Sequence, residues 1–234
     1  ELKVRDEMLA PHPRTPEVVR KHLADYYASI EYLDSQVGRI LDALRDAGRL
    51  DNTLVVFASD HGLAIGSHGL FGKQNLYEHS MRSPVILAGP EIPEGKTLDA
   101  FAYLHDLFPT LGDLAGVAGP EGSEGLSLAP VLQGREAARR ALMFNAYMKI
   151  QRSIRDERWK LIVYPQINKR QLFDLANDPD ERRDPARAGE IERLTALLVE
   201  QQAAAGDTAP LSTDHPQPVE VDLHQLQQAA TGSQ

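Results

Sequence analysis

A long apolar stripe is the feature that most constrains how this chain can fold. Apolar residues recur at alternating steps of four and three from Val19 to Leu44, which is the spacing of one face of an α-helix. Thr15-Pro16 provides an N-cap hydroxyl and a proline at the first helical position, and Gly48 provides a stop. The sequence therefore predicts a long amphipathic helix between these signals. Its stripe consists of Val19, Leu23, Tyr26, Ile30, Leu33, Val37, Ile40 and Leu44.

A short apolar run follows this helix almost at once. Asp51-Asn52 makes a turn, and residues 53–58 (TLVVFA) are rich in β-formers, so we expect a buried strand there. A helix followed directly by a buried strand is typical of an α/β architecture. Residues 84–88 predict a second short strand, and residues 105–115 predict a helix that Gly116 stops.

The pattern changes after about residue 118. Four runs then have the character of antiparallel strands, and residues 191–202 predict a helix. We expect an α/β domain over residues 1–140, a small antiparallel α+β subdomain over residues 141–202, and a poorly ordered tail over residues 203–234. The four predicted strands lie within residues 141–148, 149–156, 158–165 and 169–175.

The composition excludes several classes of protein. The formal charge of −9 over 234 residues lacks the basic footprint of a nonspecific nucleic-acid binder, so no nucleic-acid partner is expected. The apolar runs are much shorter than the roughly 18 residues that a membrane-spanning helix needs, so no membrane span is expected. Cys is absent, which excludes disulfides and thiolate metal ligands.

Ionisable residues crowd the segment after the first predicted strand. Asp60 and His61 follow the strand directly, at the strand end where open α/β sheets bind ligands. A carboxylate and an adjacent imidazole can bind one cation. The ammonium of Lys73 suits an anion, and His68 lies between glycines that permit close approach to a ligand. From the residues alone, a polar turn explains Asp60 and His61 equally well. A solvated lysine and an exposed loop histidine are the more common explanations for isolated residues such as Lys73 and His68.

Three further ionisable residues close the segment. Glu78, His79 and Arg82 could line a pocket, although the spacing of four between Glu78 and Arg82 equally fits an ordinary ion pair on a helix. Further along the chain, Trp159 is expected to pack the second sheet. Lys160 is expected to be solvated rather than to reach a substrate.

In their order along the chain, these fragments resemble the sulfatase family of the alkaline-phosphatase-like superfamily. The similarity covers about residues 15–200. It implies part of an alkaline-phosphatase-like sheet with flanking helices, followed by a small antiparallel subdomain. It rests on YLDSQVGR (32–39), DNT (51–53), SDHG (59–62), GSHGL (66–70), GK (72–73), YEHS (77–80), GP (89–90), DLFPT (106–110), LAG (114–116), RWKL (158–161), LFDL (172–175) and DP (178–179).

The resemblance implies a role for each matching residue. Asp60 and His61 would be metal ligands, with Ca²⁺ as the usual ion and Mg²⁺ as the alternative. Lys73 would contact the oxygens of the sulfate, and His68 would contact the substrate at the rim. The substrate would be a sulfated sugar or a small sulfate ester. A fixed cation and a fixed lysine would stabilise the negative charge that develops as the ester bond breaks.

The nucleophile of the family has no counterpart in this sequence. Sulfatases attack with a formylglycine made from the first residue of a Cys/Ser-x-Pro-x-Arg motif, and no Cys occurs and no Ser is followed two positions later by Pro. The family's first pair of metal-binding Asp residues is also without a match upstream of the predicted helix. The resemblance therefore implies the C-terminal half of the catalytic domain plus the small C-terminal domain, without turnover by this chain alone.

Other interpretations of the sequence stay open. The chain could require an upstream half-domain or a homo-oligomer to complete its sheet. It could instead be a non-catalytic module that binds a metal, an anion or a partner. A third interpretation is a phosphate or phosphonate ester hydrolase of the same superfamily. Members of the sulfatase family are usually exported, which implies a periplasmic or secreted protein.

Overall fold

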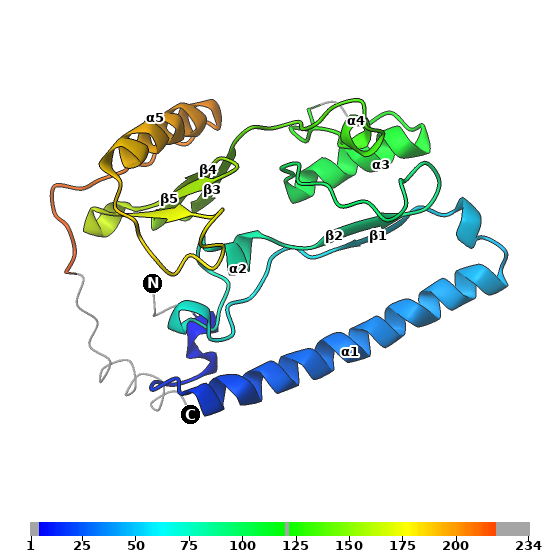
Figure 1. The fold of residues 1–234 in the computed structure, drawn as a ribbon, viewed down its shortest axis with the longest axis horizontal. Helices are drawn as coiled ribbons and strands as arrows, with labels where there is room; N and C mark the ends of the chain where they lie inside the picture. Colours follow the sequence, from blue (N-terminus) through cyan, green and yellow to red (C-terminus); the bar gives the residue numbers. More distant parts are fainter. Residues whose placement is uncertain (1–4, 120–121, 219–234) are drawn as a thin grey trace. The chain divides into compact units, whose positions relative to one another are not determined.

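The computed structural model describes residues 5–119 and 122–218 (Figure 1). The chain forms two compact units. Unit 1 combines residues 1–29, 61–83 and 143–234, and unit 2 combines residues 30–60 and 84–142. The part of the expected tail that covers residues 219–234 lies outside the described residues. No helix among the described residues is long and apolar enough to cross a membrane.

Unit 2 contains a two-stranded antiparallel sheet. Strand β1 (Val55–Ala58) pairs with β2 (Val85–Ala88), and Val55 lies opposite Ala88. Helix α1 (Pro16–Asp46) begins in unit 1 and continues into unit 2, and the 3₁₀ helix η2 (Leu50–Asn52) leads from it to β1. The helix and both strands confirm the elements expected from the sequence.

The expectation that the first strand is buried was wrong. The residues of β1 are half-buried or exposed, and no residue of α1 is buried. Ile86 of β2 is 61% exposed and Ile40 of α1 is 63% exposed. The pattern of apolar residues reports which faces can be buried, but burial also requires a covering layer. Such a layer is missing from the described part of unit 2.

The remainder of unit 2 is organised around a buried carboxylate. Asp106 ends the 3₁₀ helix η4 (Leu104–Asp106) and accepts hydrogen bonds from the backbone N–H of Tyr103 and Leu126, at 2.8 and 2.7 Å. The guanidinium of Arg140 donates to both of its oxygens, at 2.6 and 2.8 Å. Helix α3 (Leu107–Ala115) ends at Gly116 as predicted. Helix α4 (Ala129–Leu132) follows.

Unit 1 contains a four-stranded antiparallel meander. The sequence predicts four antiparallel strands here, and in the sheet they lie in the chain order β3, β4, β5 and β6. Helix α5 (Ala188–Ala204) packs on the sheet and buries Leu194 and Leu198 completely (Figure 1). All residues of β5 are buried, so this sheet holds the core. The strands are β3 (Met143–Tyr147), β4 (Gln151–Arg155), β5 (Trp159–Tyr164) and β6 (Lys169–Asp174).

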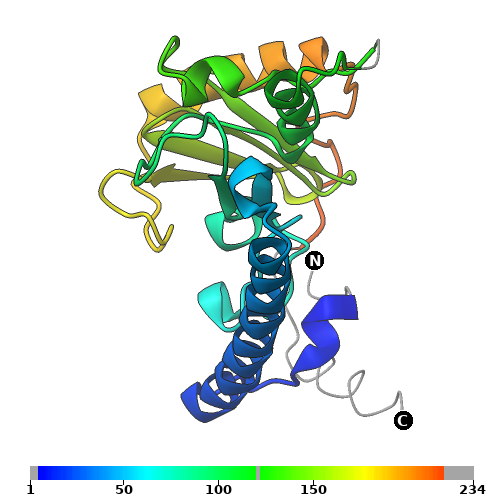
Figure 2. The ribbon, with the colours of Figure 1, turned by 90° about the vertical axis from the view of Figure 1, so that its right-hand side faces the viewer.

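The segment of residues 61–83 belongs to unit 1 and packs on this sheet. Leu76 joins Ile162 and Phe173 in one apolar cluster. A second cluster joins Phe71 to the start of α1 and to the segment before it. The loop between β6 and α5, gold in Figure 2, contains Glu181, which is also buried. Short elements of unit 1 are η1 (Arg5–Leu9), η3 (Ser67–Gly69), α2 (Glu78–Met81) and η5 (Pro165–Ile167).

Candidate functional site

Asp60 and His61 follow the carboxyl end of β1, and the boundary between the two units falls between them. Asp60 is exposed. In His61, Nδ1 lies 2.8 Å from the carbonyl oxygen of Gly62. A carbonyl only accepts hydrogen bonds, so Nδ1 carries the proton and the lone pair lies on Nε2. This is a tautomer that can coordinate a metal.

Gly62 is required by a close approach of two backbone segments within unit 1. A Cβ atom at Gly62 would lie 1.9 Å from the carbonyl oxygen of His79. The N–H of Gly62 also donates to the carbonyl of Ser80 at 2.9 Å. Only glycine fits here without a shift of the backbone. The residue after His61 thereby fixes the loop entrance against α2.

His68 and Lys73 belong to one compact loop of unit 1. Its two arms are joined by backbone hydrogen bonds from Ala64 to Gly72 at 3.1 Å and from Gly66 to Leu70 at 2.7 Å. Lys73 follows the second arm directly and is half-buried. The structure thus brings two of the four predicted site residues onto a single ordered loop.

The imidazole of His68 is held in place by residues of the second half of the chain. Its backbone is left-handed, with φ of 56°, a conformation that is uncommon outside glycine. Its Nε2 lies 3.0 Å from the carbonyl oxygen of Glu181, and its ring stacks on Tyr77 with a centroid distance of 4.0 Å. The hydroxyl of Tyr77 donates to Gln171 at 2.9 Å. The loop tip is therefore tied to β6 and to the loop that follows it.

A buried charge network lies behind this loop. Lys160 is 2% exposed, and its Nζ lies 2.9 Å from Oε1 of Glu78 and 2.8 Å from Oε1 of Glu181. Arg155 pairs with the other oxygen of Glu78. The network corrects the expectation for Lys160 and excludes one alternative that the sequence left open for Glu78. Lys160 is not solvated, and the ion-pair partners of Glu78 are Lys160 and Arg155 rather than Arg82.

The pKa values of the two carboxylates in the network are shifted in opposite directions. Burial raises the pKa of Glu78, but the positive charges of Lys160 and Arg155 outweigh burial, and the pKa is lowered. For Glu181, burial outweighs the attraction of Lys160, and the pKa is raised. One lysine therefore sits between two acids with different affinities for a proton.

His79 is a neutral histidine at physiological pH. Burial, followed by the positive charges of His68 and Lys160, lowers its pKa to about 4. Its Nε2 is buried and has no hydrogen-bond partner among the described residues. A neutral ring adds no positive charge to the network that already holds Lys160 and Arg155.

The segment before α1, expected to be an irregular lead-in, supports the loop from its other side. Glu7 is 7% exposed, and its carboxylate accepts hydrogen bonds from the backbone N–H of Phe71 and Gly72. Arg14 pairs with Glu7 at 2.6 Å. The sequence did not single out Glu7, Arg14 or Glu181, because each is a charged residue in a run of polar residues without apolar periodicity.

The described residues form no complete metal site. They include no group of three or more His, Cys, Asp or Glu side chains that could hold a metal ion. Asp60 and His61 supply one oxygen and one nitrogen donor, whereas Ca²⁺ takes 6–8 oxygen ligands and Mg²⁺ takes six ligands. The donors fit such an ion in kind, but they are too few to complete its coordination.

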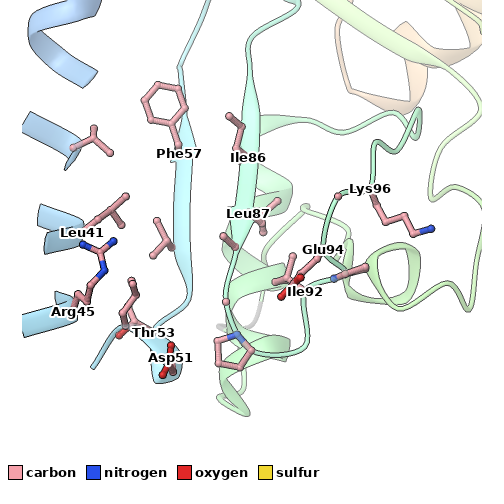
Figure 3. Close-up of a pocket in the computed structure, with 18 of the residues that line it drawn as sticks. Leu41, Arg45, Asp51, Thr53, Phe57, Ile86, Leu87, Ile92, Glu94 and Lys96 are labelled. Carbon is pink, nitrogen blue, oxygen red and sulfur yellow. The ribbon is translucent and has the colours of Figure 1, made fainter. Parts of the chain in front are cut away.

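A cavity of about 940 Å³ lies within unit 2, away from these residues. It is lined by the second half of α1, by both strands, and by residues 89–90 and 92–96 (Figure 3). Leu41 of α1, Phe57 of β1 and Ile86 of β2 contribute apolar surface to it. None of the four predicted site residues lines this cavity. It is a feature of the uncovered apolar faces and not of the ionisable segment.

The mixed α/β architecture, with its antiparallel sheets and flanking helices, is that of the alkaline-phosphatase-like fold. Residues 6–117 match the sequence profile described as Sulfatase. Residues 66–206 match the profile described as N-sulphoglucosamine sulphohydrolase, C-terminal. The chain belongs to the sulfatase family.

Proteins of known sequence support this assignment. The chain is 38% identical over 200 residues to a choline-sulfatase of Rhizobium meliloti, a match that covers 82% of the chain and 38% of the relative. It is 34% identical over 208 residues to an N-acetylglucosamine-6-O-sulfatase of Bacteroides thetaiotaomicron, covering 82% of the chain and 37% of the relative. The chain therefore spans under two fifths of the length of these relatives.

Solved structures also match most of this chain over only part of their own length. A protein in complex with its substrate D-glucosamine-2-N,6-O-disulfate is 32% identical and matches with a TM-score of 0.75 over 82% of this chain and 42% of its own. A phosphonate monoester hydrolase from Silicibacter pomeroyi is 25% identical and matches with a TM-score of 0.74 over 83% of this chain and 43% of its own. Each match covers less than half of the solved chain.

Proposed function

We propose that this chain forms one wall of the active site of a sulfuric ester hydrolase. The observation that carries the proposal is the ordered loop of residues 64–73, which follows Asp60-His61 and holds both His68 and Lys73. A loop fixed by hydrogen bonds presents its side chains without reorganisation, and such preorganised charge is the largest catalytic contribution in many enzymes.

Each predicted site residue has a role in this proposal. Asp60 and His61, as consecutive residues, donate to one divalent cation, with Ca²⁺ as the expected ion and Mg²⁺ as the alternative. When bound, the cation supplies a Lewis acid to a sulfate oxygen. Lys73 donates hydrogen bonds to the sulfate oxygens, and His68 contacts the substrate at the rim.

The proposed site is completed by residues outside this chain. The sequence lacks the formylglycine motif, and the described residues lack a full set of metal ligands. The uncovered apolar faces of unit 2, which include Ile40 and Ile86, support the presence of a covering partner. We propose an upstream half-domain as that partner, and a homo-oligomer as the alternative. By itself, the chain is then inactive.

A sulfated sugar is the proposed substrate, with a small sulfate ester as the alternative. The relative that is an N-acetylglucosamine-6-O-sulfatase and the neighbour that binds a disulfated glucosamine support the sugar. The choline-sulfatase relative supports the small ester. The phosphonate monoester hydrolase neighbour favours a second candidate activity on phosphonate esters. By family resemblance, we place the protein in the periplasm or outside the cell.

Calorimetric titration with Ca²⁺ and with Mg²⁺ tests the metal site. The proposal expects weak binding that disappears in Asp60→Asn and persists in Asp51→Asn, a control that removes another exposed carboxylate of unit 2. Equal binding by both variants would contradict the assignment of Asp60.

Assays of the same chain test the activity. We expect no product from an aryl sulfate, a 6-sulfated glucosamine or an aryl phosphonate. Turnover of a sulfate ester by the chain alone would refute the proposal of an incomplete site. Turnover of the phosphonate alone would favour the second activity, and metal binding without any turnover, even with an added upstream half-domain, would favour a binding module.

A further inference from the structure

The peptide groups that precede Lys73 are anchored by a carboxylate from a distant part of the sequence. The carboxylate of Glu7 accepts from the N–H of Phe71 at 3.1 Å and from the N–H of Gly72 at 2.7 Å. The side chain of Glu7 is 5% exposed. Charge-assisted hydrogen bonds to backbone N–H groups are stronger than neutral ones. Glu7 therefore fixes the two residues that lead directly into Lys73.

Arg14 binds the carboxylate of Glu7 and also the carbonyl of Gly69, at the start of the segment that leads to Lys73. Its Nη1 lies 2.6 Å from Oε2 of Glu7 and 2.6 Å from the carbonyl oxygen of Gly69. Its guanidinium carbon lies 4.9 Å from the centre of the Phe71 ring. The side chain of Arg14 is 4% exposed. The pair is therefore desolvated, and loss of either partner would leave the other charge buried without its counter-charge.

The anchoring matters for Lys73 because the residue before it, Gly72, is a glycine. Glycine has the widest choice of backbone conformations of any residue. Here the N–H of Gly72 is bound by Glu7, and its carbonyl accepts from the N–H of Ala64 at 3.1 Å. Both peptide groups of the glycine are therefore fixed, and the direction in which the chain enters Lys73 is set. Without Glu7, one of these two constraints is lost.

We propose that Glu7 and Arg14 are positioning residues for Lys73, acting through the Phe71–Gly72 peptide. This inference rests on the proposed function only in that Lys73 is the proposed contact for the sulfate oxygens. The pair itself touches no substrate. Its function is to hold the ammonium of Lys73 at the end of a rigid arm.

The test compares Glu7→Gln with Glu17→Gln, a control that neutralises an exposed carboxylate on the first turn of α1. Amide hydrogen exchange is measured by NMR at Phe71, at Gly72 and at Leu161 of β5. We expect exchange at Phe71 and Gly72, whose N–H groups donate to Glu7, to rise about tenfold or more in Glu7→Gln, because the weakened bonds involve a charged group. Exchange at Leu161 is expected to be unchanged, and the control is expected to match the wild type.

A second readout follows the Cε resonance of Lys73 during titration with inorganic sulfate. We expect the apparent affinity to fall about tenfold in Glu7→Gln, and Arg14→Lys to give a smaller loss because it keeps the charge but not the planar donor fork. An equal rise of exchange at Gly72 and Leu161 would mean that the pair only stabilises the fold, and would overturn the inference. Unchanged exchange at Phe71 and Gly72 would overturn it as well.

The two proposals fail in different ways. If the wild-type Lys73 resonance does not respond to sulfate, the role of Lys73 in the proposed function is refuted. The exchange data still decide whether Glu7 positions that residue.

Discussion

The Nζ atom of Lys160 lies 2.9 Å from Oε1 of Glu78, although 82 residues separate the two in the sequence. The same ammonium contacts Glu181 at 2.8 Å. This contact joins β5 to the helix that follows the candidate loop. The ordered state of the loop is therefore coupled to the integrity of the second sheet.

The first prediction concerns this buried lysine. Lys160→Met should lower the free energy of unfolding by about 3–5 kcal/mol, because it leaves the carboxylate of Glu181 buried without its counter-charge. Urea unfolding followed by the fluorescence of Trp159, the single tryptophan, measures the effect. The matched control is Lys149→Met, at an exposed lysine, for which we expect little change. A loss below about 1 kcal/mol in Lys160→Met would indicate that solvent reaches the network.

The second prediction concerns the pH dependence contributed by His79. Because burial lowers the pKa of His79 to about 4 from an ordinary value of 6.5, the unfolded chain binds more protons than the folded chain between these values. Stability that is present above pH 6.5 is then lost as the pH falls toward 4, by at most roughly 1.4 kcal/mol per pH unit. Urea unfolding at several pH values should show a shallower decline in His79→Gln than in the wild type. An exposed-site control, His215→Gln, should keep the wild-type slope.

The third prediction concerns Gly62. Gly62→Ala should destabilise unit 1 by about 3 kcal/mol, since the new methyl group would overlap the backbone of His79 and force the two segments apart. The control is Gly38→Ala in the middle of α1, where no atom lies within 4 Å of the added Cβ. Alanine is the better helix former, so this variant should gain up to about 1 kcal/mol. Equal effects of the two substitutions would show that the close approach does not exist in solution.

The fourth prediction concerns the tautomer of His68. Its Nε2 faces the carbonyl oxygen of Glu181, so Nε2 should carry the proton of the neutral ring and Nδ1 should carry the lone pair. The ¹⁵N chemical shifts of the imidazole at neutral pH distinguish the two tautomers directly. In Tyr77→Leu, which removes the stacked ring, we expect a mixture of both. A neutral ring in the wild type whose proton lies on Nδ1 would exclude a hydrogen bond from Nε2 to Glu181.

Much of the fold could be predicted from the sequence, because periodicity and turn residues determine where elements begin and end. The stripe from Val19 to Leu44 and the stop at Gly116 correspond to α1 and α3. Burial of β1 could not be predicted correctly, because it depends on a covering layer and not on the strand itself. The ion-pair partners of Glu78 could not be predicted either. A spacing of four suggests Arg82, whereas the folded chain brings Lys160 and Arg155 to Glu78.

The candidate site could likewise be predicted only in part from the sequence. The motif order predicts Asp60, His61, His68 and Lys73 as site residues, but it carries no information on which residues hold them in place. Glu7 and Glu181 lie in polar runs whose composition is that of solvated loops. Their burial arises only when distant segments pack on residues 61–83. Support residues of this kind become visible in the structure and not in the sequence pattern.

The long-range pairing of Glu78 has a consequence for how the chain folds. Its partners lie 77 and 82 residues downstream, and the backbone N–H of Glu78 binds a carboxylate 103 residues away. Contacts of such high sequence separation form late, because the entropy of closing the intervening chain must be overcome first. During synthesis, the loop that carries His68 and Lys73 emerges long before the downstream residues that hold it, such as Lys160 and Glu181. We therefore expect this loop to acquire its native geometry only after β5 and the segment around Glu181 have been made.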